Sequence, residues 1–247
     1  MKKIIEQIDK ENNIARITIV DERWYVRDNV FYPSVTWIAG HYPKGIAFYR
    51  WLADKGWNES LAIKNAAANK GSKIHQAIVD LIDGNTIDMH SEYQRENDDG
   101  SYTPEELTLE EYEALMAFND WFAQTKPKVL EREFVLFNED PLYAGTGDLL
   151  AEIDGKRYLI DFKTGQDIWP EHELQVSAYA HAMSEIVLTA ILQIGYRRNK
   201  RGWKFTEIAD KYDLFLASYR IWQEECGNTK PYVKDYPMSL SLEVKDG

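Results

Sequence analysis

Residues 148–163 have the sequence DLLAEIDGKRYLIDFK, and this pattern predicts a β-hairpin that ends in charged side chains. Asp154-Gly155 is a favoured pair for a two-residue type I′ turn, and strand-forming residues flank it on both sides. If the strands pair outward from that turn, Asp148 falls opposite Asp161. The sequence therefore predicts two carboxylates whose Cβ atoms lie about 4.5 to 5.5 Å apart at the end of the hairpin.

The other charged residues of the hairpin agree with this register. Glu152 falls opposite Arg157, a favourable pair of opposite charges. Because side chains alternate between the faces of a strand, Lys163 shares a face with Asp161. A shift of one residue would turn these side chains to the other face.

The opposed carboxylates predict a metal site, because they repel each other unless a positive charge lies nearby. Hard carboxylate oxygens suit Mg²⁺ or Mn²⁺. We expect Asp148 and Asp161 to be the main ligands of one or two ions, with the backbone carbonyl of Phe162 as a further ligand. A solvated ion pair is the alternative, since Asp/Glu-x-Lys also occurs at Asp154–Lys156 and Glu243–Lys245. Only the copy at Asp161 lies in an apolar strand opposite another acid.

Four segments match a known nuclease pattern in the expected order: Gly71–His75, Gly147-Asp148, Ile160–Gly165 and Gln175–Tyr179. With these residues the chain resembles the PD-(D/E)xK nuclease superfamily, and more closely its RecB-type exonuclease branch. Residues 32–36, 43–44 and 51–52 are similar to the start of phage-encoded members and of mitochondrial genome maintenance exonucleases.

The resemblance implies both a fold and an activity. The fold is α/β, with a restriction-endonuclease-like core in which helices flank a central mixed β-sheet, preceded by an N-terminal β-rich segment and a helical insertion. The activity is metal-dependent exonuclease cleavage of DNA, on single strands or strand ends, in recombination, replication or repair. A recombination or replication protein is an expected partner. A catalytically silent DNA-binding subunit and a restriction-like endonuclease are the alternatives.

The resemblance also implies roles for individual residues. A histidine at the place of His75 ligates the second ion, although a histidine beside apolar helix positions is otherwise more often a core residue. Lys163 orients or deprotonates water, or stabilises the charge on the phosphate. Gln175 and Tyr179 share a helix face and either hold Lys163 or contact the DNA backbone; packing of the helix on the sheet is the alternative for Tyr179.

Two further groups are weaker candidates for the site. Glu133 shares a predicted strand face with Glu131, Val129 and Val135, so it lies beside the metal ligands or forms a salt bridge. The bases of the turn after residue 196 are expected to bind phosphates, or else form an exposed, soluble hairpin tip; they include Arg197, Arg198 and Arg201.

The composition of the chain limits the number of domains and the kinds of cofactor and location that we expect. The 247 residues are 44% hydrophobic, enough for one nuclease domain with a sizeable core. A single cysteine, Cys226, excludes a four-cysteine iron–sulfur cluster. No apolar stretch is long enough for a membrane span, so we expect a soluble, cytoplasmic protein. The net charge is −12, but residues 83–113 alone carry −10, so a local basic surface for DNA remains possible.

The expected elements divide the domain into four parts. Residues 1–36 are the N-terminal part, with two or three strands expected within 12–36. Residues 37–126 are mainly helical, with helices over 43–56, 59–69 and 72–82 and a further helix starting at a Thr108–Glu111 capping box. An acidic, mobile surface loop is expected at 84–106. Residues 127–208 form the catalytic sheet, with strands at 129–137, 147–163, 187–198 and 203–208 and a helix that starts at Pro170. Residues 209–247 form a last helix and a tail.

Overall fold

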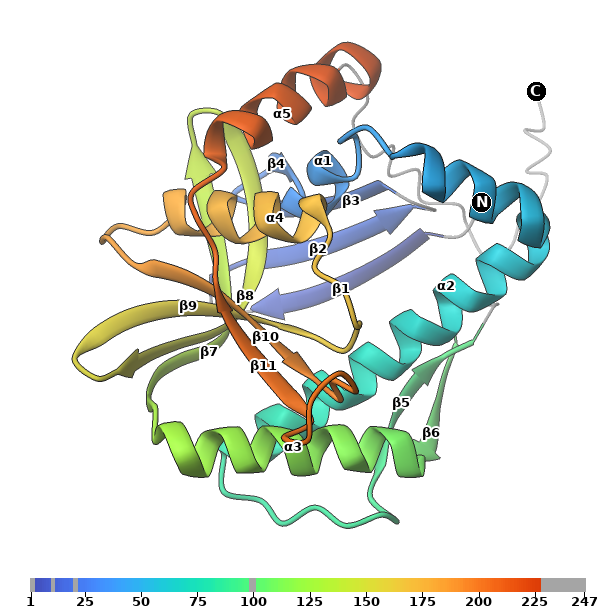
Figure 1. The fold of residues 1–247 in the computed structure, drawn as a ribbon. Coiled ribbons are helices and arrows are strands. Elements are labelled where there is room, and N and C mark those ends of the chain that lie inside the picture. The colour runs from blue at the N-terminus through green and yellow to red at the C-terminus, as the bar shows by residue number, and fades with distance from the viewer. Residues whose placement is uncertain (1–2, 10–11, 20–21, 98–100, 228–247) are drawn as a thin grey trace, which may run out of the picture.

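The computed structural model describes residues 3–9, 12–19, 22–97 and 101–227. Within these ranges the chain forms five helices with a five-stranded, a four-stranded and a two-stranded sheet (Figure 1). The mixed α/β class predicted from the sequence is therefore confirmed. None of the helices in these ranges is long and apolar enough to cross a membrane.

The five-stranded sheet has the order β11-β10-β9-β8-β7. It is mixed, because β9 and β10 are parallel while the other neighbours are antiparallel. The parallel pair is joined by α4 (Pro170–His181), which begins at Pro170 as expected. The strands are β7 (Lys128–Glu139), β8 (Leu142–Ile153), β9 (Lys156–Lys163), β10 (Leu188–Ile194) and β11 (Trp203–Glu207).

The hairpin of β8 and β9 has the predicted register. Asp154 and Gly155 both have positive φ, 50° and 74°, as a type I′ turn requires. Glu152 pairs with Arg157, and the regular pairing ends at Leu149 and Ile160. The next two residues along the strands are Asp148 and Asp161.

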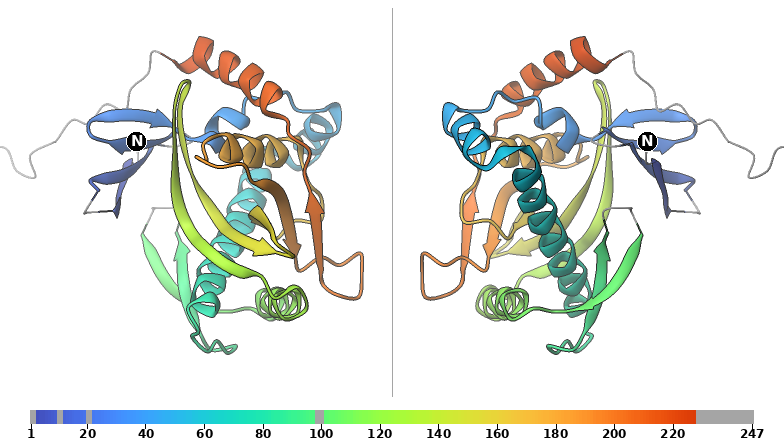
Figure 2. Two further views of the ribbon diagram at one scale, coloured as in Figure 1. Left: turned by 90° about the vertical axis from the view of Figure 1, so that its left-hand side faces the viewer. Right: turned by 90° about the vertical axis from the view of Figure 1, so that its right-hand side faces the viewer.

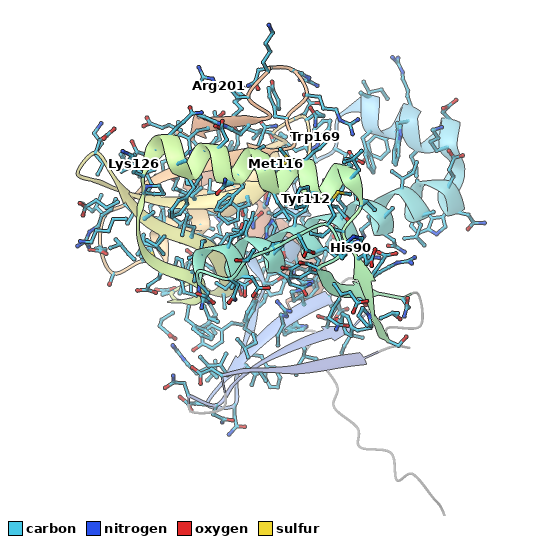
Figure 3. All side chains as sticks on the ribbon, turned by 90° about the horizontal axis from the view of Figure 1, so that it is seen from below. His90, Tyr112, Met116, Lys126, Trp169 and Arg201 are labelled. Carbon is cyan, nitrogen blue, oxygen red and sulfur yellow. The ribbon has the colours of Figure 1, made fainter. Side chains whose placement is uncertain are left out.

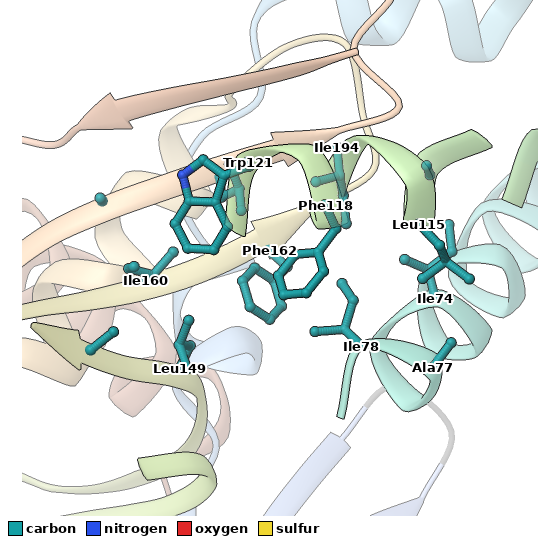
Figure 4. Packing of buried hydrophobic residues seen from close by; sticks show 14 of the residues in the cluster. Ile74, Ala77, Ile78, Leu115, Phe118, Trp121, Leu149, Ile160, Phe162 and Ile194 are labelled. Carbon is teal, nitrogen blue, oxygen red and sulfur yellow. The ribbon is translucent and has the colours of Figure 1, made fainter. Parts of the chain in front are cut away.

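Helices cover both faces of this sheet. One face packs against α3 (Leu109–Thr125) and the C-terminal half of α2 (Ile46–Ile82), with Ile78, Phe118 and Phe162 at the centre of the contact (Figure 4). The rings of Phe118 and Phe162 meet edge to face, with 5.6 Å between their centroids. The capping box of Thr108 and Glu111 opens α3 as predicted. The other face packs against α1 (Val35–Ala39), α4 and α5 (Tyr212–Cys226).

The N-terminal sheet has three strands in the range where two or three were expected, β2 (Ile14–Ile19), β3 (Glu22–Arg27) and β4 (Val30–Pro33), and a further strand before them, β1 (Lys3–Asp9). Figure 2 shows this sheet beside the long β7–β8 hairpin. The chain then makes one parallel bridge between Ser34 and Ala144 of β8. β1 was not predicted from the sequence; it is an edge strand of the described sheet and hydrogen-bonds to β2.

The helical region differs from the prediction of three separate helices. Gly56 interrupts α2 with φ 72° and ψ 167°, as expected for a helix stop. Gly71, however, does not break the helix, and Ser72 caps nothing. A glycine costs a helix only about 1 kcal/mol, and packing of the neighbouring Ile74 and Ile78 offsets that cost because both side chains are fully buried.

The prediction of an acidic loop at 84–106 was wrong for two segments, because β5 (Glu92–Glu96) pairs with β6 (Tyr102–Glu106). Side-chain amides of α2 satisfy the free edge of β5. Gln76 exchanges hydrogen bonds with the backbone of Gln94 at 3.3 and 3.4 Å, and Asn69 does the same with Glu96 at 3.0 Å. These polar contacts carry no periodic apolar signal, so the sequence pattern did not predict the strands.

A buried lysine anchors the acidic hairpin. Lys73 of α2 is 1% exposed, and its Nζ lies 2.8 Å from a carboxylate oxygen of Glu105 and 2.8 Å from one of Glu111. The ion pairs join α2, β6 and α3, so part of the negative charge of this segment is neutralised inside the fold.

Two glycine substitutions test this packing. A Cβ on Gly145 would lie 2.2 Å from a ring carbon of the buried Tyr179, whereas a Cβ on Gly71 would have its nearest neighbour at 3.9 Å. We predict that Gly145→Ala lowers the free energy of unfolding by about 2 to 3 kcal/mol. The matched control Gly71→Ala should leave it unchanged or raise it by about 0.5 to 1 kcal/mol. Urea unfolding measures both, and equal stabilities for the two variants would contradict the described packing.

Candidate active site

The charged end of the β8–β9 hairpin lies between α2 and α4. Six residues predicted from the sequence lie there in two groups of direct contacts: His75 of α2 with Asp148 of β8, and Asp161 and Lys163 of β9 with Gln175 and Tyr179 of α4. Three separate parts of the chain thus supply the site.

Asp148 links the two strands beyond their last regular pair. Its Oδ2 accepts a hydrogen bond of 2.7 Å from the backbone N–H of Phe162, and its Oδ1 lies 3.5 Å from Nδ1 of His75. Burial alone would raise the pKa of Asp148. The positive charges of His75 and Lys163 and the Phe162 hydrogen bond outweigh that effect, so the pKa is below its usual value.

Asp161 is almost completely buried, at 1% exposure. Its Oδ1 accepts a hydrogen bond of 3.0 Å from the amide of Gln175. Its Oδ2 lies 2.5 Å from Nζ of Lys163 in an ion pair, but the geometry is not that of a hydrogen bond. Burial raises the pKa of Asp161 to about 6; the charge of Asp148 adds to this shift and that of Lys163 opposes it.

Gln175 organises the α4 side of the site. Its amide nitrogen donates to Asp161 and, at 3.1 Å, to the hydroxyl of Tyr179, while its amide oxygen accepts from Lys163 Nζ at 3.3 Å. Both polar atoms of the Gln175 amide have partners in the site, so this hydrogen-bond network holds the side chains of Gln175 and Lys163 in place. Tyr179 is buried against Gly145, which has no side chain in the way.

His75 is not enclosed by the core in the way that its apolar neighbours are. Its side chain is 27% exposed, and its ring meets the ring of Phe162 edge to face at 5.7 Å. Burial lowers the pKa of His75, but the charge of Asp148 and the contact with it raise the pKa more, so the net shift is upward.

Glu133 lies opposite Asp148, because Arg132 pairs with Leu149 and Phe134 with Gly147. It has a positive φ of 44°, and removal from water and the charge of Asp148 raise its pKa although the residue is exposed overall. A β-bulge changes the predicted strand faces. The register shifts between Val129 and Glu131, so Val129 and Val135 pack in different clusters rather than on one face.

Donor chemistry at the site fits a hard divalent cation, but the site is not preformed. In the described ranges, no three His, Cys, Asp or Glu side chains are already spaced to hold a metal ion. The acids instead contact cationic side chains, Asp148 with His75 and Asp161 with Lys163. The buried Oδ2 of Asp161, which now faces the Lys163 ammonium at 2.5 Å, is a hard oxygen that suits an ion ligand. His75 and Lys163 would have to turn from their present contacts.

Two arginines of the basic turn between β10 and β11 are paired with acids. Arg197 pairs with Glu110, and Arg198 makes two hydrogen bonds to Asp167 at 2.7 and 2.9 Å. Arg201 lies over the ring of Trp203 at 5.2 Å, on the outer loop labelled in Figure 3. The structure therefore weakens the expectation that Arg197 and Arg198 form a free phosphate-binding patch.

Sequence reasoning missed two polar residues near the site. Gln193, only 1% exposed, pairs with Lys163 in the parallel ladder and donates to the Gly165 carbonyl at 3.0 Å, which fixes the chain after the lysine. A glutamine in the apolar run of β10 was the available signal in the sequence.

The second residue is His172, at the start of α4. Burial and the charges of Lys163 and Lys44 lower its pKa to about 3. Nothing local in the sequence marks that histidine.

No protein-family model matches the sequence, and a search of curated proteins also gives no match. The functional assignment therefore depends on the residues and their geometry.

Proposed function

We propose that this protein is a metal-dependent DNA exonuclease with a PD-(D/E)xK core of the RecB type. It would hydrolyse phosphodiester bonds in single strands or at strand ends, in recombination, replication or repair. The observation that carries the proposal is the buried Asp161, held by Lys163 and Gln175 next to the Asp148–His75 pair.

A purely structural role explains this cluster poorly. Burying several charged groups costs more free energy than packing apolar side chains of similar size, unless the charges serve another purpose. Asp161 even has a raised pKa, which means that its surroundings disfavour the carboxylate form. Such perturbed groups concentrate at functional sites.

The residues have distinct roles in the proposed hydrolysis. Asp148, Asp161 and His75 would hold one or two Mg²⁺ or Mn²⁺ ions, which, when bound, activate water and stabilise negative charge on the phosphate. Lys163 would orient the attacking water or stabilise the charge that develops on the phosphate oxygens. Gln175 holds the lysine in place, and Tyr179 holds Gln175.

Exposed aromatic side chains on α2 support a single-stranded substrate. Trp57 is 72% exposed and Trp51 is 36% exposed, so both could stack with unpaired bases. Trp37, in contrast, packs against Trp24 and Trp222.

The catalytic assignment is tested by substituting Asp148 and the lysines of two Asp-x-Lys copies, Asp161–Lys163 and Asp154–Lys156. We predict that Lys163→Ala and Asp148→Ala each lower cleavage of a labelled single strand at least about 100-fold, since a positioned charged group contributes roughly that much. Lys156→Ala, in the exposed turn copy, should keep full activity. Unchanged melting temperatures would show that the variants fold, and cleavage by folded Lys163→Ala would contradict the role of the lysine.

Metal binding should depend on pH. The pKa of Asp161 is raised to about 6 and that of His75 is raised above its usual value, so protons compete increasingly with a cation as the pH falls. We predict that Mn²⁺ raises the melting temperature at pH 8 and that this shift shrinks as the pH falls to 5.5. Asp148→Asn should remove the shift.

An equal Mn²⁺ shift at both pH values, or in Asp148→Asn, would count against the metal site. His75→Ala separates the two ions, because a nitrogen ligand favours Mn²⁺ over Mg²⁺. It should weaken the Mn²⁺ effect more than the Mg²⁺ effect.

A closed circular plasmid distinguishes the exonuclease from the endonuclease alternative. An enzyme that requires a strand end leaves the circle intact and degrades the linearised DNA, and we predict this result. Cutting of the circle at a similar rate would support the endonuclease. No cleavage or binding of any DNA with either ion would reject the proposed function.

A further inference from the structure

One face of the N-terminal sheet carries a row of long side chains. Arg16 of β2 pairs with Tyr25 of β3, which pairs in turn with Tyr32 of β4. Residues directly opposite each other on neighbouring strands lie on the same face of a sheet. The row therefore runs across three strands, and at its β2 end Glu6 of β1 is paired with Arg16.

This row faces the β7–β8 hairpin. The Tyr32 ring lies 4.8 Å from the Phe137 ring, and the Tyr25 hydroxyl lies 2.9 Å from Oγ1 of Thr146. Phe137 pairs with Ala144 and Val135 with Thr146, so successive pairs lead along β7 and β8 towards the candidate site.

The next pair along β7 and β8 is Glu133 with Asp148, and the next residue of the row is Arg16. Figure 1 shows β4, β3, β2 and β1 following one another along the length of β8. Removal from water and the charge of Asp148 raise the pKa of Glu133, while His75, Arg132 and Arg16 each lower it in part. Arg16 therefore lies close enough to Glu133 to act on its charge, from an element about 120 residues away in sequence.

We propose that Arg16 binds a phosphate of the nucleic-acid strand, so that the N-terminal sheet forms one wall of the active site. This inference rests on the proposed function. The side chain is partly exposed, so an anion can reach it. A guanidinium forms paired hydrogen bonds with phosphate oxygens.

The test compares two arginines of the same sheet. Arg16→Gln removes the proposed contact, and Arg27→Gln is the matched control, because Arg27 pairs with Glu139 at the far end of β7. Binding of a fluorescein-labelled single-stranded oligodeoxynucleotide is followed by anisotropy over a range of salt concentrations, in a Lys163→Ala background. Steady-state kinetics use otherwise wild-type protein.

We expect Arg16→Gln to weaken strand binding about tenfold, raise KM more than it lowers kcat, and reduce the slope of log affinity against log salt by about 0.7. Arg16→Lys should recover part of the affinity and the salt slope. Arg27→Gln should behave like its parent.

Two results would overturn the inference. If the parent binds DNA and Arg16→Gln shows the same affinity and salt slope, Arg16 only balances the charge of Glu133, and the proposed function stands. If the parent binds no DNA at all, the inference fails together with the proposed function.

Discussion

The antiparallel register of β8 and β9 determines where the charged groups of this protein lie. A two-residue turn with positive φ at Asp154 and Gly155 leaves the strands one way to pair, and that pairing brings Asp148 and Asp161 to the same end of the sheet. Alternation then puts Lys163 on the face of Asp161, where Gln175 of α4 reaches both. The site follows from a turn located six residues from each of its two acids.

Each aspartate at that end of the sheet contacts a cationic side chain, but the two carboxylates are not stabilised equally. Asp148 is favoured as a carboxylate because His75 and the Phe162 N–H stabilise its charge. Asp161 is disfavoured as a carboxylate because it is buried next to another acid, even with a lysine in contact. Two chemically identical side chains therefore differ in proton affinity because of their surroundings alone.

The sequence predicted those parts of the structure that depend on neighbours along the chain. The hairpin register, the capping box of α3 and the start of α4 at Pro170 all follow from local residue patterns. The strands at 92–96 and 102–106 were not predictable in this way, because amides of α2 complete their hydrogen bonding. The contribution of Gln193 depends on a parallel pairing of β9 with β10, and that of Arg16 on contact between two sheets, neither of which is visible in local periodicity.

The amide contacts of α2 with β5 also join two regions that appear unrelated in sequence. Gln76 follows His75 directly, so one turn of α2 contacts the candidate site and the acidic hairpin at once. With Asn69, it occupies hydrogen-bonding positions on β5 that another strand would otherwise use. Local opening of this turn would both withdraw the histidine from the acids and expose a strand edge. Exchange of the Gln94 and Glu96 amide protons therefore reports on the order of the site from a position outside it.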